Sequence, residues 1–140
     1  MIEYVHKHIT SELDQNTRTD TIFILTSIIL NLITLAVNSS IATSSRNPAV
    51  RIPDTSSLIV MFVFICLIIV VNLVAVIGLI KGKSTRGKLL KGLIDMYKDQ
   101  KVDKYYDASL LGNYNLRYDL FIMVVVVTGI IAIIVPFILR

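Results

Sequence analysis

Four polar side chains in one apolar stretch are spaced four, three and four residues apart: Ser27, Asn31, Thr34 and Asn38. Residues at these intervals share one face of an α-helix. Amides and hydroxyls on such a face either line a water-filled path, where they partly replace ion hydration, or hydrogen-bond to neighbouring helices. Asp20 extends this face, and Asn72 falls at a similar depth in a second apolar stretch. The pattern therefore leaves two interpretations open, a pore wall and an Asn31–Asn72 seam within one bundle.

A second group of side chains is basic and begins where the second apolar stretch ends: Lys81, Lys83, Arg86, Lys88 and Lys91. Basic clusters beside a membrane attract anionic lipid headgroups, at about 1 kcal/mol per residue. The alternative is that the cluster serves only to orient the protein in the membrane. No nucleic-acid-binding motif accompanies the charge, so we expect no nucleic-acid partner.

The other ionisable groups and the single cysteine do not match the pattern of a metal or catalytic site. Four aspartates lie four residues apart: Asp95, Asp99, Asp103 and Asp107. Lysines lie among them and the spacing is not that of a calcium loop, so we favour a solvated helix face over a cation site shared between subunits. His6 and His8 point to opposite sides of a helix, and Cys66 is expected to be a buried, unreactive thiol. We expect no metal, no cofactor and no catalytic residue.

The elements that carry these residues follow from composition. The chain has 140 residues, of which 54% are hydrophobic and only 17% charged, which is unlike a soluble domain. Three stretches of at least 20 residues carry no charge. About 20 helical residues cross the hydrocarbon core of a bilayer. The sequence predicts an all-α integral membrane protein with transmembrane helices at 21–43, 58–80 and 119–139.

Between and before the spans we expect three further segments. Residues 1–20 have apolar residues at helical spacing, namely Ile2, Val5, Ile9 and Leu13, and predict an amphipathic helix that runs without a break into the first span. Residues 44–57 are rich in Ser, Asn and Pro and predict an external loop. Residues 81–118 predict a short helical hairpin, with helices at 84–101 and 104–111, an N-cap at Asp103 and a break at Gly112–Asn113.

The charges predict the orientation of the chain. Segment 81–118 holds nine of the fourteen basic residues, whereas the connection between the first two spans holds only Arg46 and Arg51. The positive-inside rule then places the N-terminus and segment 81–118 in the cytoplasm and the C-terminus outside. We expect a protein integral to the cell (inner) membrane.

One architectural resemblance covers most of the chain. A helix from Glu3 to Asn38 leads into the first span, and a basic segment with Leu-rich and Tyr-rich helices precedes the last one, from Lys88-Leu89-Leu90-Lys91 to Asp107-Ala108-Ser109-Leu110-Leu111. This layout resembles small prokaryotic membrane effectors of the SLATT and Pycsar transmembrane type. The resemblance implies a homo-oligomer that compromises the inner membrane in antiviral defence. The third span and the lack of a sensor domain depart from that pattern.

Two functions remain in view. The first is a homo-oligomeric pore or ion channel, with ions passing along the polar face of the first span. The alternative is a non-conducting scaffold or small subunit that presents segment 81–118 to a partner and pairs Asn31 with Asn72. We do not expect an enzyme. No nucleophile–base pair, zinc motif or phosphate loop is present, and only Asp20 and Asp119 lie at the membrane interfaces, too few for a small lipid kinase.

Overall fold

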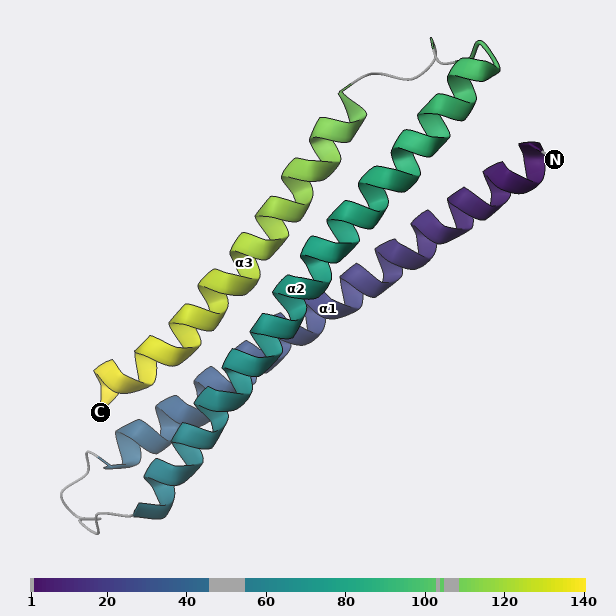
Figure 1. Cartoon of the computed structure of the whole chain (residues 1–140). Helices are drawn as coiled ribbons and strands as arrows, with labels where there is room; N and C mark the ends of the chain where they lie inside the picture. The colour runs from purple at the N-terminus through teal and green to yellow at the C-terminus, as the bar shows by residue number, and fades with distance from the viewer. Residues whose placement is uncertain (1, 46–54, 103, 105–108) are drawn as a thin grey trace.

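Three long α-helices make up the part of the chain that the computed structural model describes, which is residues 2–45, 55–102, 104 and 109–140. Helix α1 covers Ile2–Ser45, α2 covers Thr55–Asp99 and α3 covers Leu110–Leu139. Helices α1 and α3 run in one direction and α2 runs in the other, so the two termini lie at opposite ends of the molecule (Figure 1). Each helix packs against the other two.

Each helix is long and apolar enough to span a membrane. The outward faces carry large apolar side chains; for example, Ile22 is 64% exposed, Phe62 65% and Ile138 72%. Soluble monomers rarely expose continuous apolar surface on this scale, whereas lipid covers it without cost. The prediction of an all-helical membrane protein is confirmed at this level. We treat segments 21–43, 58–80 and 119–139 as the membrane-spanning parts; Asp119, at the start of the third, is the one charged residue among them.

Helix α1 is continuous from Ile2 to Ser45, as its lack of Gly and Pro predicts. At a rise of 1.5 Å per residue it is about 66 Å long, roughly twice the hydrocarbon thickness of a bilayer. The amphipathic pattern before the span is only partly used in packing. Ile2 and Val5 are exposed, whereas Ile9 and Leu13 are half-buried.

Helix α2 does not end with its apolar span, and the separate helix predicted at 84–101 is wrong. The helix continues through Lys81–Lys83 to Asp99. Lys, Arg and Leu are good helix formers, and Gly82, Gly87 and Gly92 each weaken a helix by only about 1 kcal/mol. The helix ends where Lys101 adopts a positive φ of 58° and the Val102 amide donates to the Tyr97 carbonyl at 3.0 Å.

Helix α3 begins earlier than the sequence predicts, and the expected break at Gly112–Asn113 is wrong. Both residues lie in the first turn of the helix, where backbone amides need no intrahelical acceptor and Gly costs little. The predicted helix at 104–111 falls largely on residues 105–108, and its cap on Asp103, which lie outside the described residues. In the predicted loop 44–57, α1 reaches Ser45 and α2 starts at Thr55, and residues 46–54 lie outside the described residues.

One buried apolar cluster of the bundle lies near Asp20 and Tyr118. Ala75, Leu79 and Val125 are at most 2% exposed, and Phe23 and Ile122 pack against them. This cluster brings together side chains from all three helices at a level between Asp20 and Asn31 of α1. It separates two polar layers of the bundle.

Candidate functional site

The polar face of α1 points into the bundle. Its side chains are at most 6% exposed: Asp20, Ser27, Asn31, Thr34 and Asn38. Helices α2 and α3 of the same chain supply the partners of Asn31 and Asp20. In this arrangement the face meets protein rather than water or a second subunit.

At the level of Asn31 the three helices are joined by what we call the amide seam, formed by Asn31, Asn72 and Thr128. Asn31 Nδ2 donates to Asn72 Oδ1 at 3.0 Å, and Asn72 Nδ2 donates to Asn31 Oδ1 at 2.8 Å. Asn31 Nδ2 also donates to Thr128 Oγ1 at 3.1 Å. Reciprocal amide bonds satisfy groups that would be costly to leave unpaired in lipid. This geometry matches the interpretation in which Asn31 and Asn72 pair within one bundle.

The sequence reasoning overlooked Thr128, although a signal was present. Thr128 is the only hydroxyl residue between Asp119 and Arg140. Its neighbour Gly129 allows α3 to approach Asn72, because a Cβ built on Gly129 would lie 2.7 Å from Asn72 Nδ2. A hydroxyl next to a glycine in an otherwise aliphatic span indicates a close polar crossing.

Asn38 is placed on the same buried face but takes no part in the seam. It is fully buried, and neither its Nδ2 nor its Oδ1 has a hydrogen-bond partner within the described part of the chain. A buried amide without partners costs roughly 1–3 kcal/mol. Replacing Asn38 with an apolar residue should therefore cost the bundle less than replacing Asn31.

A second polar layer lies at the membrane boundary, and we call it the polar clasp: Asn16, Asp20, Gly82 and Tyr118. The Tyr118 hydroxyl donates to Asp20 Oδ2. Asn16 Nδ2 lies 3.2 Å from both Asp20 Oδ2 and the Gly82 carbonyl, and 3.1 Å from the Tyr118 hydroxyl. A Cβ on Gly82 would overlap the Asp20 carboxylate, so glycine is needed for this approach. The clasp ties together all three helices.

Burial and local partners act in opposite directions on the ionisation of the clasp. Burial raises the pKa of the Asp20 carboxyl above its usual value, and the Tyr118 hydrogen bond and the positive charge of Arg86 offset only part of this rise. Burial and the hydrogen bond to Asp20 raise the pKa of Tyr118, so the phenol keeps its proton and remains the donor. The carboxylate therefore depends on its donors to remain charged in a buried position.

The five residues of the basic run have different environments because α2 continues straight out of the membrane. Lys83 forms an ion pair with Asp119 at 2.7 Å. Arg86 turns inward, where its NH1 donates to Thr17 Oγ1 at 2.8 Å and its guanidinium stacks 4.4 Å from the Tyr114 ring. Lys81, Lys88 and Lys91 are exposed.

A cavity of about 250 Å³ lies beside the clasp, between α1 and α3. Arg86 of α2 and Arg117 of α3 line its polar part, and Ile24, Leu25 and Phe121 line its apolar part. The sequence reasoning did not anticipate this cavity. Its two arginines are 31 positions apart in the sequence and line one cavity only because α3 folds back along α2 (Figure 1).

The remaining candidates are not assembled into a site. No group of His, Cys, Asp or Glu that could hold a metal occurs among the described residues. His6 instead forms a hydrogen bond of 2.9 Å with the Tyr97 hydroxyl, and Asp95 lies 3.9 Å from Lys98. Asp103 and Asp107 lie outside the described residues. Cys66 is exposed on α2, so the prediction of a buried thiol is wrong.

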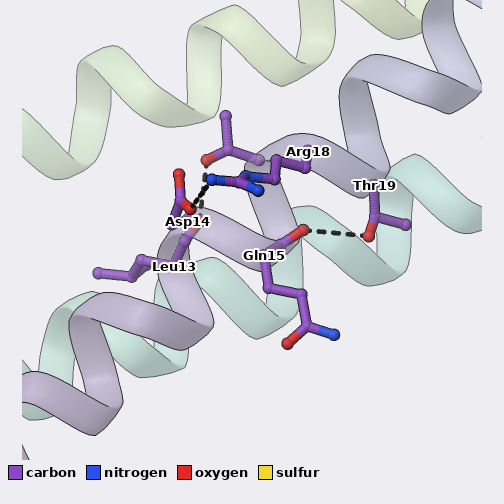
Figure 2. A network of polar contacts seen from close by, with 6 residues as sticks. Leu13, Asp14, Gln15, Arg18 and Thr19 are labelled. Carbon is purple, nitrogen blue, oxygen red and sulfur yellow. Dashed lines mark hydrogen bonds and ion pairs between the residues drawn. The ribbon is translucent and has the colours of Figure 1, made fainter.

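On the exposed side of α1 next to the clasp, several side chains bond within the helix itself. Figure 2 shows Arg18 paired with Asp14 at 2.9 Å and the Thr19 hydroxyl donating to the Gln15 carbonyl at 3.0 Å. Both partners of the ion pair are more than half exposed, and such pairs contribute little to stability. These bonds reinforce α1 locally and join it to no other helix.

Comparison with known proteins adds no family to these observations. No protein-family model matches the chain, and no curated protein or solved structure matches it.

Proposed function

We propose that this chain is a non-conducting membrane scaffold that holds a rigid helical stalk for a partner on the cytoplasmic side of the inner membrane. The stalk comprises residues 2–20 of α1 and 81–99 of α2, which continue the spans as unbroken helix. The observation that carries this proposal is the amide seam, because it uses the polar face of α1 for packing within one chain.

The layering of the bundle supports the non-conducting part of the proposal. Leu79 and Val125 have no exposed surface and lie between the polar clasp and the amide seam. A closed apolar layer in a pathway excludes water and hydrated ions. Ions that entered beside the clasp would meet this layer before they reached Asn31.

The length and surface of the stalk support the proposal that it binds a partner protein. Residues 81–99 rise about 28 Å beyond the span, and the His6–Tyr97 hydrogen bond joins the two helices near the far end. Lys88 and Lys91 are exposed and form no ion pair within the described part of the chain. We propose that the partner offers an acidic surface, and that Lys81, nearer the membrane, contacts anionic headgroups.

The pore or channel is the competing proposal, together with the membrane-compromising role that the architectural resemblance implies. It requires a homo-oligomer whose subunits rearrange until the polar face of α1 meets water. Ser27, Asn31, Thr34 and Asn38 would then leave their positions inside the bundle. Such a change would break the amide seam in every subunit.

Ion flux into liposomes tests the two proposals against each other. We expect purified wild type to give the same potassium flux as protein-free liposomes, and Asn31→Leu/Asn38→Leu to give the same flux as wild type. The reason is that the side chains changed do not line a water path. An added channel-forming peptide shows that the assay detects conduction. Wild-type flux that the double variant abolishes at equal oligomeric state would contradict the scaffold and establish the pore.

A further inference from the structure

We propose that the cavity between α1 and α3 is a binding site for one anionic phospholipid of the cytoplasmic leaflet, with its phosphate on Arg86 and Arg117. The cavity holds about 250 Å³ and lies beside Asp20 and Tyr118, at the boundary of the first and third spans. This site is more specific than the headgroup contact of Lys81, and it rests on the membrane orientation proposed above. It does not depend on whether the chain conducts ions.

Two arginines supply the positively charged hydrogen-bond donors in the polar part of the cavity. Arg86 uses NH1 on Thr17, while its buried Nε has no hydrogen-bond partner within the described residues. Arg117 lies with its guanidinium 6.0 Å from the Phe121 ring and is exposed. Guanidinium groups match the geometry of phosphate oxygens and bind them with two parallel hydrogen bonds. An anionic group placed here would accept hydrogen bonds from the exposed guanidinium of Arg117.

The one carboxylate that lines the cavity does not cancel this attraction. Asp20 is 6% exposed and receives hydrogen bonds from Tyr118 and Asn16 within the clasp. Arg86 and Arg117 contribute two positive charges against that single negative charge. The local balance therefore favours an anion.

The apolar part of the cavity selects an amphiphile over a soluble phosphate. Ile24, Leu25 and Phe121 line it, and all three belong to the membrane-spanning segments. Leu25 lies about 7 Å deeper than Asp20 along α1, which corresponds to the start of the acyl chains. A free phosphate makes no use of these side chains, and a zwitterionic lipid brings a positive group to two guanidiniums. An anionic phospholipid satisfies both parts of the cavity.

Lipid titration with native mass spectrometry of the intact chain tests this site. The probes are phosphatidylglycerol, phosphatidylcholine and glycerol phosphate, added to wild type in a neutral detergent. We expect one phosphatidylglycerol per chain, bound about tenfold more tightly than phosphatidylcholine, since one charge-assisted contact to phosphate is at stake. Glycerol phosphate at equal concentration should not displace the lipid.

Two variants separate the cavity from the general basic surface. Arg117→Gln removes one cavity charge at an exposed position, and Thr21→Trp fills the cavity without changing charge. Each should weaken phosphatidylglycerol binding about tenfold, whereas Lys91→Gln, which removes an exposed charge outside the cavity, should leave it unchanged.

Three results would overturn the site. Equal weakening by Lys91→Gln and Arg117→Gln would mean that diffuse surface charge binds the lipid. If Arg117→Gln and Thr21→Trp both bound phosphatidylglycerol as tightly as wild type, the cavity would be excluded as the binding site. Displacement by glycerol phosphate would identify the ligand as a soluble phosphate. None of these results bears on ion flux, so failure of the lipid site and failure of the scaffold are distinguishable.

Discussion

Replacing Tyr118 with Phe is expected to lower the free energy of unfolding in mixed detergent micelles by about 1.5–3 kcal/mol, because hydrogen bonds to charged groups contribute on that scale. The variant keeps the ring, which is 5% exposed, and removes only the hydroxyl that donates to Asp20. The carboxylate would then remain buried with Asn16 as its remaining donor in the clasp. The loss arises from an incompletely paired buried charge, which is costlier than the loss of a neutral hydrogen bond.

Tyr4→Phe is the matched control for this change. Tyr4 is 79% exposed on the same end of the molecule, so removal of its hydroxyl should alter the free energy of unfolding by less than about 0.5 kcal/mol. Denaturant titration followed by helical circular dichroism measures both variants. Equal stability of Tyr118→Phe and Tyr4→Phe would show that the clasp contributes nothing to holding the three helices together.

Replacing Asn31 with Leu is expected to destabilise the bundle by about 1–2 kcal/mol, the upper part of the range found for hydrogen bonds between membrane helices. Asn31 bonds to both Asn72 and Thr128, so its loss leaves the half-buried Asn72 amide on α2 without its reciprocal partner. Asn72→Leu should cost a similar amount for the same reason. Thr26→Leu changes an exposed polar residue of the same span and should be nearly neutral.

The double variant Asn31→Leu/Asn72→Leu separates the pair from the individual side chains. Because both amides of the reciprocal pair are then replaced, its destabilisation should be smaller than the sum of the single effects by about 1 kcal/mol. The measurement is a double-mutant cycle of unfolding free energies under one set of detergent conditions. Strictly additive effects would mean that Asn31 and Asn72 do not interact in the folded protein.

The spans and the continuity of α1 could be predicted from the sequence because both depend on local properties. A long uncharged run has one way to satisfy its backbone in lipid, and residues 2–45 contain neither Gly nor Pro. The spacing from Ser27 to Asn38 also placed these side chains on one face. That spacing does not say whether the face is a pore wall or a seam within one bundle. The answer depends on where α2 and α3 lie, which the residues of α1 alone do not reveal.

The ends of α2 and α3 were predicted poorly because turn-forming residues were given too much weight. The prediction ends the second span at residue 80 and begins a new helix at 84, whereas α2 continues through Gly82, which admits the Asp20 carboxylate. The sequence predicts a break between helices at Gly112 and Asn113, yet both residues lie within the first turn of α3. In both places the surrounding residues favour helix, and the glycine reflects packing or a helix end rather than a loop.

The clasp was missed because its residues are far apart in sequence, although their positions give an indication in hindsight. Asp20 immediately precedes the first uncharged stretch and Tyr118 lies one residue before the aspartate that begins the third. Helices α1 and α3 run in the same direction (Figure 1), so residues at the same end of their spans lie at the same depth. A buried acid and a tyrosine at equal depth are natural partners.

The most direct test of the account is whether water reaches the polar face of α1 in the folded protein. Ser27→Cys in a Cys66→Ser background introduces one thiol at a position that is 1% exposed. Thr19→Cys in the same background is the exposed control on the same helix. In liposomes opened to a hydrophilic thiol reagent on both sides, we predict rapid labelling at position 19, and labelling at position 27 only after the bundle is unfolded. Labelling of both positions at similar rates in the folded protein would contradict the buried seam and restore the polar face of α1 as the wall of a water path.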